Sequence, residues 1–122
     1  MNEFLKLLDT LLGENGCPWD KEQTHESMKP YLIEESNEVI EAIDKKDMES
    51  LKEELGDLLL QVAFHSKLAE KAGAFTFDDI LDGISHKLVR RHSHVFGDDI
   101  ALSADDVTKI WEANKAKERK LR

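Results

Sequence analysis

Two short acidic stretches decide the fold of this chain: EESNE at residues 34–38 and EELGD at residues 53–57. Each lies in an apolar pattern with the period of a helix, and each carries two acidic residues three positions apart. At about 100° per residue, Glu35 falls on the apolar face of its helix, Glu38 falls at the border of that face, and Glu34 falls toward the polar face. The first helix therefore carries a carboxylate pair beside the side it buries.

The second stretch repeats this arrangement, with Glu54 among apolar residues and Asp57 at the border of the apolar face. A short link joins the two helices, so we expect antiparallel neighbours whose acidic pairs face each other. Clustered carboxylates raise one another's pKa, and bound cations remove the repulsion. A solvated acidic face would explain one pair, but two pairs in matching register favour a metal site. Oxygen ligands favour Mg²⁺, with Mn²⁺ as a substitute, and the predicted ligands are Glu35, Glu38, Glu54 and Asp57.

Composition predicts a single all-α domain over residues 1–122. A chain of 122 residues with 40% apolar content has enough apolar side chains for one modest core. Charged residues make up 35% of the chain, with only two prolines and six glycines, which is typical of a helix-rich protein.

Net charge and cysteine content limit the partners and the compartment. The net charge of −9 argues against binding to duplex nucleic acid, which requires a basic surface. Phosphate groups can still bind where metal ions reverse the local charge. Cys17 is the only cysteine, so no disulfide framework is expected. No export signal or membrane span is evident, and we therefore expect a cytoplasmic protein without membrane contact.

Turn and capping signals divide the chain into about five helices. We expect Thr24 to cap the second helix, Pro30 to kink it early, and Asp47 to cap the third. Gly73 is expected to end the third helix in a left-handed conformation. The expected helices cover about residues 2–13, 25–44, 48–72, 77–92 and 104–119.

Basic and aromatic residues offer contacts for a phosphorylated ligand. Lys87 and Arg91 lie four residues apart on the fourth helix and can contact phosphate oxygens. Cations near the C-terminus of a helix also interact favourably with its dipole, which would explain them without a ligand. Trp111 and Lys115 have the same spacing, so the indole can stack on a base or anchor the last helix to the core. Trp19 is either a core residue or part of a ligand wall.

Four stretches together resemble one known family. The stretches are CPWDKEQTH, YLIEESNEVIEAI, LKEELGDLLLQVAFHS and KLVRRHSHVF, and they are similar to those of the MazG nucleoside triphosphate pyrophosphohydrolases, in particular to the N-terminal type of MazG domain. The resemblance covers nearly the whole chain, which would be a single-domain form. It implies a MazG-like helical bundle with a four-helix metal-binding core, assembled as a homodimer or a dimer of dimers.

The resemblance also implies an activity. Mg²⁺ would bind the same four acidic residues, and Glu38 or Glu35 would accept a proton from water. The residues that correspond to family positions near the phosphates and base are Lys87, Arg91, Trp111 and Lys115. The implied reaction cleaves a nucleoside triphosphate between its α and β phosphates, giving a monophosphate and pyrophosphate, and can serve to clear non-standard nucleotides. The alternative is a helical nucleotide-binding or protein-interaction module that keeps the fold without turnover.

Overall fold

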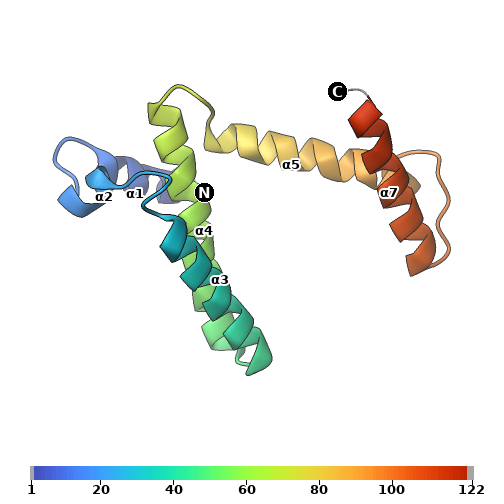
Figure 1. The fold of residues 1–122 in the computed structure, drawn as a ribbon, viewed down its shortest axis with the longest axis horizontal. Coiled ribbons are helices and arrows are strands. Elements are labelled where there is room, and N and C mark those ends of the chain that lie inside the picture. The colour runs from blue at the N-terminus through green and yellow to red at the C-terminus, as the bar shows by residue number, and fades with distance from the viewer. Residues whose placement is uncertain (1, 121–122) are drawn as a thin grey trace. The chain divides into compact units, whose positions relative to one another are not determined.

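The computed structural model describes residues 2–120, and these residues form helices without a strand (Figure 1). The helices are α1 (Asn2–Leu12), α2 (Pro18–Glu22), α3 (Lys29–Asp44), α4 (Met48–Lys71), α5 (Phe77–Arg91), α6 (Ser93–Phe96) and α7 (Ala104–Lys120). They fall into two compact units, the first ending at Phe77 and the second beginning at Asp78. The all-α prediction is confirmed, and the five expected helices are the five long ones.

Helices α3 and α4 form an antiparallel hairpin that dominates the first unit (Figure 1). Its tight turn places Lys46 in the left-handed region, with φ of 55°. Asp47 then caps α4, because its carboxylate accepts a hydrogen bond from the backbone N–H of Ser50 at 3.1 Å. At the other end of α4, Gly73 has φ of 75°, as expected for a residue without a Cβ. Both predicted ends of this helix are confirmed.

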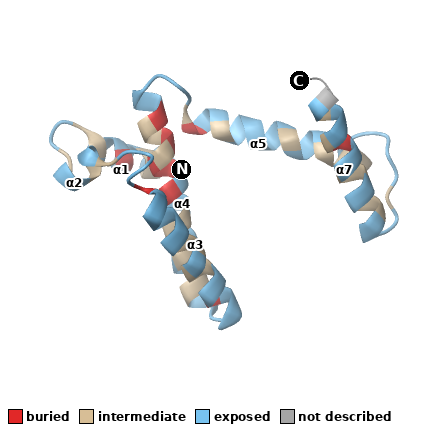
Figure 2. Cartoon of the chain, viewed as in Figure 1, coloured by how far each residue is buried: buried red, intermediate tan, exposed pale blue. Residues whose placement is uncertain are grey.

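The core of the first unit lies where α1 crosses the C-terminal half of α4, away from the hairpin turn (Figure 2). Ala63 and Phe64 of α4 are buried there because side chains from three other segments pack around them. The buried residues of this core are Leu8, Met28, Ala63, Phe64 and Phe77, with Phe4, Leu5, Leu12 and Leu68 at its edge.

Three local expectations differ from the structure. Pro30 does not kink α3, because it lies in the first helical turn, where no backbone N–H is required. Thr24 does not cap α3; its hydroxyl accepts from the N–H of Ser27 at 3.0 Å and thus closes a separate turn ahead of the helix. The expected loop after Cys17 contains the short helix α2, which begins at Pro18 for the same reason as α3 begins near Pro30.

The second unit consists of α5, α6 and α7. Glu118 of α7 binds both arginines at the end of α5, accepting from Arg90 Nε at 2.8 Å and Arg91 Nη2 at 3.0 Å. The buried Asn114 donates to Ser93 Oγ at 2.8 Å and thereby joins α7 to α6. The predicted start of the last helix is confirmed, since Ser103 Oγ accepts from the N–H of Asp106.

Candidate metal centre

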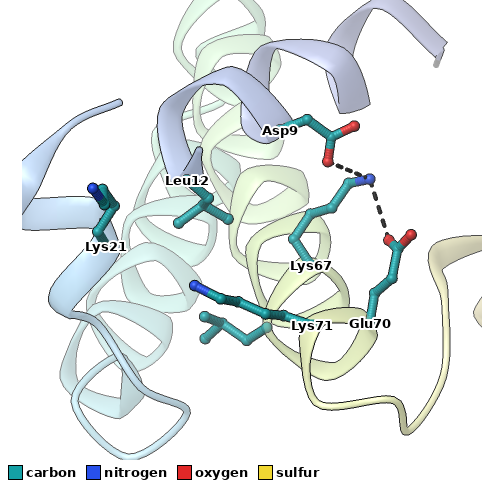
Figure 3. Close-up of a pocket in the computed structure, with 7 residues that line it drawn as sticks. Asp9, Leu12, Lys21, Lys67, Glu70 and Lys71 are labelled. Atoms are coloured by element: carbon teal, nitrogen blue, oxygen red, sulfur yellow. Dashed lines mark hydrogen bonds and ion pairs between the residues drawn. The ribbon is translucent and has the colours of Figure 1, made fainter. Parts of the chain in front are cut away.

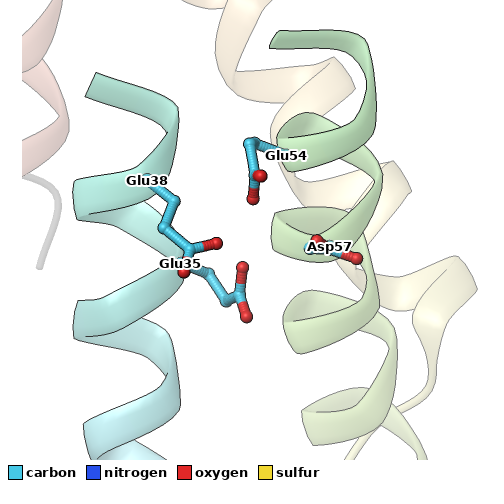
Figure 4. Close-up of side chains that lie close together, drawn as sticks. All are labelled: Glu35, Glu38, Glu54 and Asp57. Atoms are coloured by element: carbon cyan, nitrogen blue, oxygen red, sulfur yellow. The ribbon is translucent and has the colours of Figure 1, made fainter. Parts of the chain in front are cut away.

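Helices α3 and α4 bring all four predicted acidic ligands together (Figure 4). Each of the four side chains offers one carboxylate oxygen, and these four oxygens lie within 4.8 Å of one another. The spacing of three residues in each helix places both members of a pair on one face, and the antiparallel packing brings the two pairs together. The four residues are Glu35, Glu38, Glu54 and Asp57.

Burial separates these four residues from their acidic neighbours. All four are partly buried, whereas Glu34, Glu41 and Glu53 are exposed. Glu35 Oε2 and Glu54 Oε2 are buried and have no hydrogen-bond partner among residues 2–120. A buried carboxylate oxygen without a donor is costly. The arrangement therefore fits a cation, which would satisfy both oxygens at once.

The pKa values of Glu35 and Glu54 also reflect their burial and the crowded negative charge. Burial raises the pKa of Glu35, and the carboxylates of Glu38 and Asp57 raise it further. A hydrogen bond to the Glu38 carboxyl group, together with burial and the neighbouring charges, raises the pKa of Glu54 to about 7. Near neutral pH the cluster without a cation therefore holds protons that isolated carboxyl groups would release. A divalent cation could take the place of those protons.

A polar cavity of about 250 Å³ opens beside the cluster. Glu38 and Glu54 line it on one side, and Lys45 and Ser50 line it toward the hairpin turn. Lys45 forms an exposed ion pair with Glu41 at 2.7 Å. Glu38 and Glu54 therefore face both the other acids and the space that a ligand could enter.

A second cavity, of about 270 Å³, lies between α1, α2 and α4 (Figure 3). Lys67 on its wall is mostly buried and binds Asp9 at 2.8 Å and Glu70 at 3.3 Å. Two carboxylates thus share one ammonium group within the wall. None of the residues predicted to form the site lines this cavity.

The residues predicted to bind substrate lie outside the acidic cluster. Trp19, on α2, is 47% exposed and contacts Tyr31 edge to face at 5.6 Å between ring centres, so it is not a core residue. The other four belong to the second unit. Arg91 lies over the ring of Trp111 at 5.2 Å, and Lys87 and Lys115 are partly buried on the same two helices.

Two groups of functional interest were not predicted from the sequence. Glu118 fixes Arg91, and His25 pairs with His65 across 40 residues of sequence. Neither partner pair has a helical spacing, so periodicity gives no signal for them.

The four acids also lie inside a segment that matches a known domain. Residues 23–96 match the MazG nucleotide pyrophosphohydrolase domain, which is more than half of the chain. The chain belongs to the MazG family. Among its helices in residues 2–120, none is long and apolar enough to cross a membrane.

Relatives of this MazG chain are similar over nearly its whole length. It is 51% identical over 117 residues to the nucleoside triphosphate pyrophosphohydrolase/pyrophosphatase MazG of Thermotoga maritima, covering 96% of this chain and 44% of that protein. It is 51% identical over 123 residues to the nucleoside triphosphate pyrophosphohydrolase of Escherichia coli K12, covering 98% of this chain and 47% of that protein. The chain thus spans less than half the length of these curated relatives.

A solved structure supports the fold of the MazG chain. The crystal structure of a mazG-related protein from Thermotoga maritima superposes with a TM-score of 0.78 at 25% identity. The match covers 95% of this chain and 99% of that one. The similarity therefore includes α5 to α7 as well as the hairpin.

The raised pKa of Glu54 predicts how stability depends on pH without a cation. A raised pKa means that the folded state binds the proton more tightly than the unfolded chain, so this stabilisation is present below 4.5 and is lost as pH rises through about 7. We expect the melting temperature of EDTA-treated protein to fall over this interval, and Mg²⁺ to reverse the fall. Glu54→Gln should flatten the dependence. Equal melting temperatures of the wild type and Glu54→Gln at every pH would contradict this prediction.

Proposed function

We propose that this MazG domain is a Mg²⁺-dependent nucleoside triphosphate pyrophosphohydrolase. The observation that carries the proposal is the cluster of four carboxylates with two buried oxygens lacking partners, inside the segment that matches the family. The names of the similar proteins from Thermotoga maritima and Escherichia coli support the same activity. Such an enzyme would work in the cytoplasm, where nucleoside triphosphates are found.

Glu35, Glu38, Glu54 and Asp57 would hold the cation, with Mn²⁺ as a possible substitute for Mg²⁺. When bound, Mg²⁺ supplies positive charge for the phosphate oxygens and lowers the pKa of a coordinated water. A cation is needed for attraction as well, because a triphosphate would otherwise approach a chain of net charge −9 and a cluster of like charge.

Glu38 is the proposed general base. It borders the open cavity, whereas the partnerless oxygen of Glu35 is buried, so Glu38 is the better placed of the two to reach water. The water oxygen attacks the α phosphorus and passes its proton to Glu38. The bond from the α phosphorus to the bridging oxygen breaks, and that oxygen leaves with pyrophosphate.

Five residues outside the acidic cluster are the proposed substrate contacts, and four of them belong to the second unit. Two neighbouring groups hold Arg91, since Glu118 accepts from its Nη2 and Trp111 lies beneath its guanidinium. The ion pair holds the guanidinium in one orientation, and a remaining N–H donor would contact phosphate. Trp111 would stack on the base, Lys87 and Lys115 would contact phosphate, and the half-exposed Trp19 would contribute a wall.

A homodimer, or a dimer of dimers, is part of the proposal. The hairpin of α3 and α4 exposes a large set of apolar side chains that its own unit does not cover, which is unusual for a monomer. These residues are Leu32, Ile33, Ile40, Ile43, Leu55, Leu59, Leu60 and Val62.

We expect Glu54→Ala to lower turnover by more than about a hundredfold, because it removes a ligand and a charge from the cation site. Circular dichroism should show unchanged helical content, since the substitution also relieves repulsion among the carboxylates. Glu53→Ala is the matched control, because Glu53 is the adjacent exposed residue of the same helix. Near-normal Mg²⁺-dependent turnover in Glu54→Ala would exclude the proposed site.

We expect a nucleoside monophosphate and pyrophosphate as the primary products. Ion-exchange chromatography of early time points separates them from a diphosphate and orthophosphate, which would indicate attack at the γ phosphorus instead. Absence of any product with Mg²⁺ and Mn²⁺ would favour the non-catalytic binding module. Specificity constants for standard, deaminated and oxidised triphosphates would then show whether the enzyme clears non-standard nucleotides.

We expect light scattering at micromolar concentration to give twice the chain mass of 14.0 kDa, or a multiple of it. Ile40→Lys should shift the mass toward the monomer, because its exposed apolar side chain lies on the proposed contact surface. Lys52→Glu is a control at a highly exposed charged position of the hairpin. A monomer that hydrolyses nucleotide at the full rate would contradict the dimer.

A further inference from the structure

Two histidines from distant parts of the first unit form a hydrogen bond through equivalent ring nitrogens. His25 precedes α3, His65 lies on α4, and their Nδ1 atoms are 2.7 Å apart. The ring planes are within 8° of parallel, and the ring centres are 5.0 Å apart. This separation is about as large as the short Nδ1 to Nδ1 distance permits, so the rings meet edge to edge in one plane. One proton must then lie between the two nitrogens.

Burial decides which ring carries that proton. His65 Nε2 is buried and has no hydrogen-bond partner within the part of the chain that the structure describes. A buried N–H without an acceptor is rarely tolerated, so the proton of neutral His65 belongs on Nδ1 rather than Nε2. His65 is therefore the donor. His25 is exposed, and its own Nε2–H can be hydrated while its Nδ1 accepts.

The pair lies between the two segments that carry the acidic cluster. His25 belongs to the turn that leads into α3, the helix of Glu35 and Glu38, and Met28 at the end of this turn is buried in the core. His65 follows Asp57 by two turns on the buried side of α4. Closing this hydrogen bond therefore fixes the start of α3 along α4 and, through it, the register of the two acidic pairs.

We propose that His25 and His65 are positioning residues, with His65 donating Nδ1–H to His25 Nδ1, and that this hydrogen bond holds the start of α3 against α4. The bond requires a free lone pair on His25 Nδ1, so a side chain without an acceptor at this position cannot form it. The structural part of this proposal is independent of catalysis; only its consequence for the cation site rests on the proposed function.

The surroundings of the pair set the direction of the pH effect. Burial lowers the pKa of His65, the nearby His25 lowers it further, and no charged group of α1, α3 or α4 contributes to this shift. Lys67, Asp9 and Glu70 pair with one another. A lowered histidine pKa means that the folded state binds the proton less tightly than the unfolded chain. The stabilisation by the pair is therefore present above 6.5 and is lost as pH falls below it.

The proton positions can be measured directly on the full chain. Long-range ¹H–¹⁵N correlation spectra of histidine-labelled protein distinguish the two neutral tautomers of each ring. Above pH 6.5, we expect His65 to carry its proton on Nδ1 and His25 on Nε2. A proton on His65 Nε2 would overturn the assignment.

Two substitutions of His25 separate positioning from simple packing. The side-chain oxygen of His25→Asn can accept at the position of Nδ1 but does not titrate, whereas His25→Phe keeps a ring without an acceptor. One unit above about pH 6.5, we expect faster amide exchange at residues 29–38 and roughly two- to tenfold weaker Mg²⁺ binding in His25→Phe only.

His86→Asn serves as the control for a histidine on an exposed helical position. It should follow the wild type in amide exchange and in Mg²⁺ binding. Equal amide exchange in His25→Asn and His25→Phe would overturn the proposal, because the acceptor would then be irrelevant. Loss of nucleotide hydrolysis plays no part in these measurements, so an inactive protein with the expected tautomers and exchange would refute the proposed enzyme and leave the histidine pair intact.

Discussion

Repulsion among four carboxylates is the constraint on which the rest of this structure depends. Glu35 and Glu54 are held beside apolar residues, with their outer partners close enough to share protons. Two helices that carry such charges would separate unless other contacts held them together. The hairpin turn, the Asp47 cap and the core around Phe64 supply these contacts away from the cluster itself. The strain at the site is thus balanced by packing elsewhere in the first unit.

This separation of roles explains where the apolar residues are buried. The core lies at the C-terminal half of α4, where α1 and the turn before α3 cover it, while much of the hairpin keeps its apolar side chains exposed. Ile33 and Ile40, for example, remain more than half exposed. Within the part of the first unit that the structure describes, no other element covers these side chains of the hairpin. The first unit thus buries its apolar side chains at one end of α4 and leaves those of the hairpin near the acidic cluster uncovered.

The sequence predicted features that depend on local period and capping, and it missed those that depend on distant contacts. Glu35 and Glu54 could be placed because the apolar pattern defines the face of each helix, and Asp47 and Gly73 because capping needs particular side chains or backbone angles. The start of α3 was predicted a few residues too early. Pro30 was therefore expected inside the helix, where it would cause a kink, and not in its first turn. His25 and His65 could not be paired, since nothing in a helical period relates a turn to a residue 40 positions later.

The first unit carries two groups of titratable side chains whose effects on its stability have opposite pH dependences. The carboxylate cluster, when it holds no cation, is most stable at low pH, because the folded state keeps protons that the unfolded chain would release. The histidine pair is most stable above the usual pKa of histidine, because burial makes the folded state bind a proton at His65 less tightly than the unfolded chain does. Acid therefore relaxes the cluster and weakens the pair, and base does the reverse. A cation would remove the penalty on the cluster at neutral pH, where the histidine pair also favours the folded state, so the two helices would be held most firmly with the carboxylates ionised and a cation bound.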